Sequence, residues 1–432
     1  MQIWTQRLFY RNEGITTMIT VKEALNQILG SIPLLGLEKA DILSALGRII
    51  GEDIHAPRDI PPRDNSAMDG YALKSEETTG AGAESPVILN VVEDIPAGYT
   101  PQKTVETGEA ARIMTGAPVP DGADAVVMVE ETRFNDAGVR IYAEAAEGQN
   151  IRYAGEDVRE GDLVIRAGTL LRPAETGMLS ALGCSFVKVY QKPLVALIAT
   201  GDELVDIDRA ASPGKIVSSN SYSLAAQVIE CGGIPLQLGI AKDNIDNLTE
   251  KFRDAMRADI IVSSAGVSVG DYDFVKDVME DMGIGIEFWQ VAQRPGKPTT
   301  FGTKNGKLVF GLPGNPVSSM ITFEQYVRPA ILKMTGHENI FRGTIRAKLT
   351  EDIKKKRGLR YFIRGRVKRQ GREFVVETTG EQGSGILKSM ILANGIIVIP
   401  EDADFVKAGS EVMVQLLDSS QDFAKEPEYL SD

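Results

Sequence analysis

Three glycine-rich segments contain most of the residues whose types and spacing could do chemistry. They are residues 199–204 (ATGDEL), 263–273 (SSAGVSVGDYD) and 311–318 (GLPGNPVS). Glycine lets the backbone approach a ligand closely and present N–H groups to an anion. Glu203 and Asp273 add carboxylates that could hold Mg²⁺ or a sugar hydroxyl. The segments therefore indicate a site for an anionic, phosphate-bearing ligand.

The elements that must position these segments alternate between strands and helices. The predicted strands are 194–199, 234–238, 259–263 and 308–311, and the predicted helices are 221–230, 244–257, 273–282 and 316–334. This alternation favours a mainly parallel sheet, in which ligands bind beyond the carboxyl ends of the strands. A single such loop is usually a turn that caps a helix, whereas three at one edge favour a ligand site. None matches a Walker A loop or a GxGxxG fingerprint, which disfavours a standard ATPase or dehydrogenase.

Positive charge gathers at two places. Arg294 and Lys297 lie beside a turn at 293–298 and could neutralise an anion. Between Arg346 and Arg372 there are twelve Lys or Arg residues and only two acids, although the whole chain carries −13. This run is either a solvated β surface or a wall that attracts anions beside the active cleft.

Composition excludes several classes of protein. A length of 432 residues suggests about three domains. No apolar run is long enough for a membrane span, and the acidic balance disfavours general nucleic-acid binding. With two cysteines and two histidines, disulfide scaffolds, Ser–His catalysis and His-rich metal sites are improbable. We expect a cytoplasmic protein whose metal, if it has one, is bound by oxygen ligands.

The remaining segments differ in character. Residues 19–54 show helical spacing, with Thr20 as the expected N-cap and a second helical pattern at 38–50. Short β-branched runs at 58–149 predict a small β domain, and 343–418 predict another. Residues 150–190 combine short strands with a helix at 175–182 and are expected to pack back on the first segment, which makes that domain discontinuous.

Six polar motifs occur in one order along the chain. They are Asp64–Ala72, Arg112–Pro118, Gly155–Asp157, Thr200–Leu204, Gly266–Gly270 and Gly311–Pro316. Together they resemble the molybdopterin molybdenumtransferase family, which includes the E domain of gephyrin, from about Thr20 to Leu417. The resemblance implies a multidomain α/β plus β fold. Its expected parts are an elongated helical domain in two segments (18–57 and 150–192), an inserted β domain (58–149), a mainly parallel α/β molybdopterin-binding domain (193–336) and a C-terminal β barrel (337–420).

The resemblance also implies a reaction. Molybdenum from molybdate would be inserted into adenylylated molybdopterin with release of AMP and with help from Mg²⁺. The implied assembly is a homodimer, with its active cleft between the α/β domain of one subunit and the early β domain of the other. Further partners would be molybdopterin adenylyltransferase and recipient molybdoenzymes, with no nucleic acid and no membrane.

Site residues follow from the matched motifs. Those in catalytic positions are Asp69, Thr115, Asp157, Glu203, Asp243 and Asp273, with Glu203 and Asp273 as the expected metal ligands. Those expected to bind the pterin nucleotide or the oxyanion are Gly201, Gly266, Ser268, Gly270, Arg294, Lys297, Pro313, Gly314, Asn315, Pro316, Arg360 and Ser384, with Ser389 as a further candidate.

One departure and two alternatives remain. Some relatives carry lysines where this chain has Gln290 and Arg294. Arg294 keeps the charge and Gln290 does not, so the resemblance assigns no cation at 290. A molybdopterin adenylyltransferase would share the α/β domain without needing Asp69 or Thr115, and a non-enzymatic scaffold could use the same fold to bind partners. Molybdate and tungstate are not distinguished, because both are tetrahedral dianions.

Overall fold

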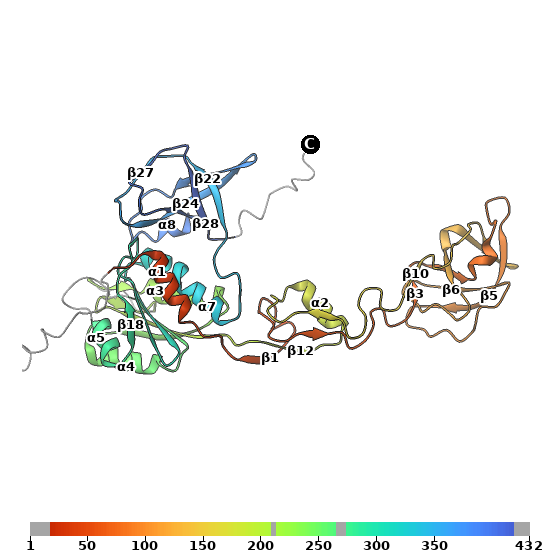
Figure 1. Ribbon diagram of the computed structural model, residues 1–432, viewed down its shortest axis with the longest axis horizontal. Coiled ribbons are helices and arrows are strands. Elements are labelled where there is room, and N and C mark those ends of the chain that lie inside the picture. Colours follow the sequence, from red (N-terminus) through yellow and green to blue (C-terminus); the bar gives the residue numbers. More distant parts are fainter. Residues whose placement is uncertain (1–17, 209–212, 265–273, 419–432) are drawn as a thin grey trace, which may run out of the picture. The chain divides into compact units, whose positions relative to one another are not determined.

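The computed structural model describes residues 18–208, 213–264 and 274–418. These form two compact units, one of residues 39–189 and the other of the chain on either side. Figure 1 shows their elements. Among the described residues, none of the helices combines the length and the apolar character that a membrane span requires.

A six-stranded sheet forms the centre of the second unit. Its order is β16-β13-β17-β21-β20-β18, and the first four strands are parallel. Their bounds are β13 (Leu194–Thr200), β16 (Ile234–Ala241), β17 (Ile260–Ser264), β18 (Gly285–Phe288), β20 (Thr300–Lys304) and β21 (Lys307–Leu312). The mainly parallel sheet is confirmed, whereas the antiparallel pairings of β20 with β21 and with the edge strand β18 were not expected from the sequence.

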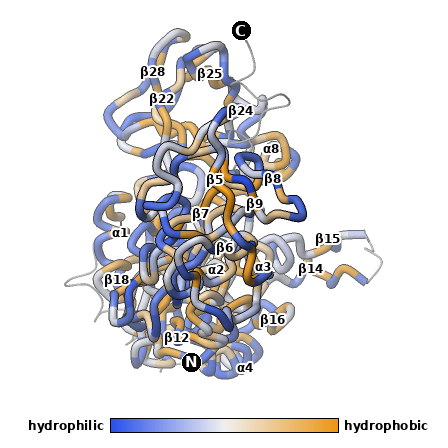
Figure 2. The backbone as a smooth tube through the Cα atoms, turned by 90° about the vertical axis from the view of Figure 1, so that its right-hand side faces the viewer, coloured by the Kyte–Doolittle hydropathy of each residue, from blue (hydrophilic) through white to orange (hydrophobic). Residues whose placement is uncertain are grey.

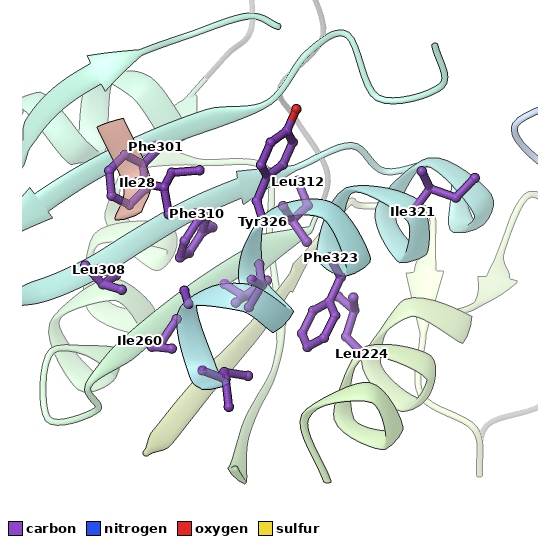
Figure 3. Close-up of a cluster of buried hydrophobic side chains, with 14 of the residues drawn as sticks. Ile28, Leu224, Ile260, Phe301, Leu308, Phe310, Leu312, Ile321, Phe323 and Tyr326 are labelled. Carbon is purple, nitrogen blue, oxygen red and sulfur yellow. The ribbon is translucent and has the colours of Figure 1, made fainter. Parts of the chain in front are cut away.

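Helices cover both faces of this sheet because its strands are apolar on both sides. Val195 and Leu197 pack into one hydrophobic cluster and Ala196 and Ile198 into the other, which is the period of two expected of a strand. The first cluster, part of which Figure 3 shows, also takes residues from the helices α1, α3, α6 and α7, and the second from α4 and α5. The helix bounds are α1 (Val21–Gly30), α3 (Ser219–Glu230), α4 (Ile245–Ala255), α5 (Phe274–Asp281), α6 (Pro316–Thr322) and α7 (Arg328–Met334).

The expected long helix at 316–334 is present, with a change of helix type in its middle. A π-helical turn, η3 (Phe323–Val327), joins α6 to α7 without a break in the chain's helical path. The strand pair β14 (Leu204–Val205) and β15 (Ile216–Val217) lies at the margin of this unit in Figure 2.

The first helix begins where the sequence indicates. Thr20 and Glu23 form a reciprocal capping box, in which the Glu23 N–H donates to Thr20 Oγ1 (3.2 Å) and the Thr20 N–H donates to Glu23 Oε2 (2.8 Å). The second helical prediction, 38–50, is wrong. This segment forms β1 (Leu37–Asp41) and then turns. Leu43 and Leu46, which the helical pattern would bury, are exposed (74% and 51%).

Residues 343–418 form the predicted β structure as a closed barrel. Its ring is β24-β25-β22-β28-β26, closed by pairing of β24 with β26, and β19 adds a parallel strand beside β24. The bounds are β19 (Gln293–Arg294), β22 (Thr344–Leu349), β23 (Ile353–Lys354), β24 (Arg360–Gln370), β25 (Glu373–Thr378), α8 (Lys388–Ile391), β26 (Gly395–Ile399), β27 (Phe405–Val406) and β28 (Glu411–Leu416).

The unit of residues 39–189 contains a sheet of order β7-β4-β6-β5-β9-β8, which confirms the β structure predicted within 58–149. These strands are β4 (Gly70–Leu73), β5 (Val87–Ile95), β6 (Glu109–Ile113), β7 (Ala125–Met128), β8 (Thr132–Asn135) and β9 (Gly138–Ile141). A separate hydrophobic cluster joins residues 45–56 to residues 158–189. Its residues come from β2 (Ile54–His55), β11 (Leu163–Ile165), α2 (Pro173–Ala181) and β12 (Phe186–Tyr190) and from the turns between them. The antiparallel pair β3 (Asn65–Ser66) and β10 (Ile151–Arg152) and the 3₁₀ turns η1 (Ser75–Thr78) and η2 (Val129–Glu131) lie elsewhere in the unit.

Candidate functional site

A pocket of about 400 Å³ opens at the carboxyl ends of the parallel strands, and we call it the strand-end pocket. Thr200 and Ser264, the last residues of β13 and β17, line it together with the loop that follows β21. Its full lining is Thr200, Glu203, Leu204, Ile216, Val217, Ser218, Ser219, Asn220, Ser264, Pro298, Pro313, Gly314, Asn315 and Pro316. The structure thus brings the first and third glycine-rich segments together. The second, with Gly266, Ser268, Gly270 and Asp273, lies outside the described residues.

The strand-end pocket offers groups suited to a polar anion. The N-terminal end of α3, at Ser218–Asn220, and that of the helical segment starting at Pro316 both contribute to its wall. Helix N-termini carry partial positive charge and unpaired N–H groups. The Asn220 amide donates to Gly314 O (2.8 Å), which fixes the two ends against each other. The sequence reasoning missed Ser218–Asn220, although a Ser-Ser-Asn run before a helix is a recognisable N-terminal signal.

Two buried polar atoms at this pocket have no hydrogen-bond partner among the described residues. Thr200 Oγ1 and Asn220 Oδ1 are both buried and unpaired within the described part of the chain, and the residues themselves are 3% and 8% exposed. Native proteins rarely leave such groups unsatisfied. A ligand or ordered water in the strand-end pocket would supply the missing hydrogen bonds.

Acidic side chains lie close together beside the first segment. The Asp202 N–H donates to Asp243 Oδ2 (3.3 Å) and the Asp243 N–H donates to Asp202 Oδ1 (3.2 Å). Partial burial raises the pKa of Asp243, and the charges of Asp202 and Glu203 raise it further. A cation would relieve this repulsion, but the described residues contain no group of three ligands arranged to hold a metal. Gly201 allows the crowding, because its φ of +151° suits glycine and a Cβ there would lie 2.7 Å from Glu203 Oε2.

In the unit of residues 39–189, Asp69 and Thr115 form a pair. Asp69 Oδ1 accepts hydrogen bonds from the Thr115 N–H (2.7 Å) and from Thr115 Oγ1 (2.8 Å). These two bonds, and the nearby charge of Arg112, hold the pKa of Asp69 below its usual value, so the exposed carboxylate stays ionised. Asp157 lies elsewhere in this unit, where its N–H donates to Ile60 O (3.1 Å) and its side chain is exposed.

A second pocket, of about 500 Å³, lies against the barrel, and we call it the barrel pocket. Arg294 and Pro295 line one side of it, and barrel residues including Arg364 line the rest. Arg364 is only 1% exposed, and its guanidinium donates to Ser389 Oγ and to Gly383 O, each at 3.0 Å. No carboxylate of the described residues pairs with it, and burial lowers the pKa of Arg364 to about 10. A buried cation without a counter-charge is a strong indication of an anion site.

Half of the cations in the basic run form ion pairs. Six of its twelve side chains form ion pairs with carboxylates from elsewhere in the barrel, namely Arg346, Lys348, Arg357, Arg360, Arg366 and Lys368. Arg360 donates to Glu401 Oε2 (2.9 Å), and Arg364 instead of Arg360 lines the barrel pocket. Sequence reasoning did not single out Arg364, because nothing in a run of cations marks the one that is buried.

The turn at 293–298 lies between the two pockets. Arg294 lines the barrel pocket, where its guanidinium lies 5.6 Å from the ring centroid of Tyr361, and Pro298 lines the strand-end pocket. Lys297 is exposed, and its carbonyl accepts from the Val291 N–H (2.9 Å). Ser384 meets the start of the helix through its backbone, since its carbonyl accepts from the Val317 N–H (3.1 Å).

Models of known protein families match nearly all of the chain. Three family models match in order: the MoeA N-terminal region (domains I and II) at residues 19–183, a probable molybdopterin-binding domain at 196–333, and the MoeA C-terminal region (domain IV) at 346–417.

Similar proteins cover almost the full length. A molybdopterin molybdenumtransferase of Nostoc sp. is 38% identical over 412 residues, which is 92% of this chain and 94% of that protein. One from Bacillus subtilis is 35% identical, covering 93% of this chain and 94% of that protein. A crystal structure of the molybdopterin biosynthesis MoeA protein from Pyrococcus horikosii aligns with a TM-score of 0.80 and 35% identity, over 93% of this chain and 99% of that one.

Proposed function

Because this chain belongs to the molybdopterin molybdenumtransferase family, we propose that it inserts molybdenum from molybdate into adenylylated molybdopterin and releases AMP. The observation that carries the proposal is the presence of two chemically different pockets on either side of one turn. One pocket suits a phosphate-bearing nucleotide and the other suits a small oxyanion. A molybdenum transfer requires both ligands to be held near each other.

The strand-end pocket is the proposed site of the adenylylated pterin. Two helix N-termini support the assignment, since they favour phosphate oxygens. The unpaired Thr200 and Asn220 atoms would bind polar groups of the substrate. Pro313 and Pro316 shape the loop whose Gly314 carbonyl is already engaged by Asn220.

The barrel pocket is the proposed site of molybdate. Arg364 supplies a buried charge with no carboxylate partner in the described chain, and Arg294 supplies a second cation at the opposite wall. Because the Arg364 guanidinium is buried, its charge-assisted hydrogen bonds to an oxyanion would be stronger than those of an exposed cation. Ser384 and Arg360 remain proposed residues near this site, with Arg360 held by Glu401.

The carboxylates are assigned to the chemistry at the phosphoanhydride. Glu203 lines the strand-end pocket, and Asp243 exchanges two hydrogen bonds with Asp202, the residue before Glu203. Asp273, which lies outside the described residues, is proposed as a further metal ligand. Carboxylate oxygens are the donors that Mg²⁺ prefers, and such an ion would neutralise charge on the phosphate oxygens as the anhydride breaks. Without it, crowded carboxylates would repel both anionic substrates.

We further propose that the active form is a homodimer and that Asp69 and Thr115 act at a site completed by the second subunit. Their hydrogen bonds support a role for Asp69 as a fixed anion, because two donors from Thr115 keep it ionised and oriented. A cytoplasmic location accords with the free thiols of Cys184 and Cys231.

The experiment that tests the proposal compares two substrate pairs. Purified protein is given adenylylated molybdopterin with molybdate and, separately, molybdopterin with ATP, and AMP and pyrophosphate are measured. We expect AMP only in the first mixture, and only when molybdate is present. Pyrophosphate in the second mixture would instead indicate an adenylyltransferase, and no reaction in either would indicate a scaffold.

A further inference from the structure

The turn that separates the two pockets is held from beneath by a buried tyrosine. Tyr326 is fully buried, and its hydroxyl donates to Gln293 Oε1 at 2.5 Å. In Figure 3 the Tyr326 hydroxyl points away from the hydrophobic cluster in which its ring packs. Gln293 is itself buried and immediately precedes Arg294. The tyrosine therefore reaches the pocket-lining turn through a single intermediate side chain.

The π-helical turn η3 places this tyrosine. Between α6 and α7 the helix widens for the five residues 323–327, so the side chains there follow a different rotation from an α-helix. One inserted residue turns the following side chains by roughly 100°, because an α-helix has 3.6 residues per turn. Such turns are rare and recur at functional sites. In this chain the turn brings a hydroxyl into hydrogen-bond contact with Gln293.

Gln293 also forms a hydrogen bond with Gly296, at the tip of the turn. Its Nε2 donates to Gly296 O (3.1 Å), and Thr299 Oγ1 donates to the same carbonyl (2.7 Å). Gly296 has a φ of +91°, and a Cβ at this position would lie 2.6 Å from Gln293 Nε2 and would also collide with Thr322 Oγ1. The turn is therefore closely packed on the amide of Gln293 and on the helix that carries Tyr326.

We propose that Tyr326 is a positioning residue that, through Gln293, fixes the turn carrying Arg294 and Lys297 and thereby sets the affinity of the barrel pocket for the oxyanion. The proposal rests on the proposed function for the identity of that oxyanion. The pairing of β19 with β24 supports this proposal. Gln293 lies opposite Arg360, and Arg294 lies opposite Tyr361, which lines the barrel pocket. Tyr326 lines neither pocket, so it acts only through the turn.

The test replaces Tyr326 with phenylalanine, which keeps the ring in the core and removes the hydroxyl. The loss leaves Gln293 Oε1 buried without a donor and frees the amide to rotate. We expect the molybdate concentration that gives half-maximal AMP release to rise by roughly tenfold, which is the change that about 1.4 kcal/mol produces. The maximal rate and the half-saturating concentration of adenylylated molybdopterin should change by less than about threefold.

Val327→Ala is the matched control. Val327 belongs to the same π-turn and to the same hydrophobic cluster, and its side chain has no polar atom. Its truncation should lower the melting temperature at least as much as Tyr326→Phe while leaving the molybdate dependence unchanged. A molybdate dependence of Tyr326→Phe equal to that of Val327→Ala would overturn the proposal, as would an equal fall of the maximal rate in both variants.

A double-mutant cycle separates the hydrogen bond from general disturbance. If Tyr326 acts through Gln293, adding Gln293→Met to Tyr326→Phe should weaken molybdate binding little beyond the larger single effect. Additive effects would contradict the proposal. Molybdate titration by calorimetry repeats the comparison without turnover. If the wild-type protein releases no AMP with molybdate, the proposed function fails, whereas an unaltered Tyr326→Phe variant of an active wild type refutes only this inference.

Discussion

Replacing Arg364 with methionine distinguishes a structural arginine from one kept for a ligand. In the folded protein this guanidinium is buried, donates to Ser389 Oγ and Gly383 O, and has no carboxylate partner among the described residues. Arg364→Met keeps an unbranched side chain of similar length and removes the charge. Its effect on folding and its effect on anion binding can therefore be measured separately.

The structure sets the expected magnitudes. Burial lowers the pKa of Arg364 from 12.5 to about 10, which corresponds to a cost on the order of 3 kcal/mol for the charged form. Methionine removes this cost but also removes two hydrogen bonds worth about 1.5–3 kcal/mol each. The two losses and the gain partly offset each other, so the free energy of unfolding should fall by no more than about 3 kcal/mol. A bound oxyanion, in contrast, loses a charge-assisted bond of about 2–3 kcal/mol, so its dissociation constant should rise roughly 30- to 150-fold.

The assay measures both quantities in one set of samples. Melting temperature is followed against molybdate concentration, and AMP release is followed over the same range. We expect molybdate to raise the wild-type melting temperature by a few degrees at about 100 times its dissociation constant, and this gain should be lost in Arg364→Met. Arg366→Met is the control, because Arg366 lies two residues along β24 and is half exposed. Equal molybdate dependence in Arg364→Met and wild type, or an equal loss in Arg366→Met, would refute the reasoning.

Three further perturbations have expected outcomes. Thr115→Val removes one of the two hydrogen bonds that lower the pKa of Asp69. We expect the acid limb of the rate–pH profile to shift to higher pH and AMP release to fall about tenfold, while the melting temperature stays unchanged. Asp243→Asn removes a carboxylate whose pKa burial raises, and a raised folded-state pKa means that stability is lost as pH rises through it. Asp243→Asn should melt about 1–2 °C higher than wild type at pH 7, this difference should vanish toward pH 3.8, and turnover should drop. A difference in melting temperature that grows toward acid pH would contradict the expected direction of the pKa shift. Gly201→Ala introduces a Cβ against the Glu203 carboxylate at a φ of +151°, so urea unfolding should show a loss of about 1–2 kcal/mol together with reduced turnover, and a neutral result would show that the segment can rearrange.

Periodicity predicted the α/β elements well because their strands are buried on both faces. Runs such as 194–199 and 259–263 are continuous apolar segments between turns, and the structure has β13 and β17 there. The 38–50 prediction failed because spacing alone cannot tell whether leucines will be buried, and Leu43 and Leu46 are exposed. The π-turn at 323–327 has no such signal, since its neighbours continue the helical pattern on both sides.

Some residues of the candidate site could likewise be predicted from the sequence, and others could not. Glycine, proline and acidic residues in ordered motifs marked the strand-end pocket, because backbone approach and metal binding require those residue types at fixed places. Arg364 and Tyr326 were not marked, because their roles depend on burial and on partners distant in the sequence. Arg364 contacts Ser389, and Tyr326 contacts Gln293, through pairings that only the closed barrel and the π-turn create.

The measurement that tests the central claim most directly is the ratio of molybdenum transferred to AMP released in a single turnover. Enzyme in excess over adenylylated molybdopterin is mixed with molybdate and Mg²⁺, and AMP released and molybdenum retained on the pterin are quantified together. If the two pockets hold the two substrates of one transfer, one molybdenum atom should be retained on the pterin for each AMP released. Neither product should form when molybdate is omitted. AMP released at the same rate without molybdate, or without molybdenum on the pterin, would contradict the account.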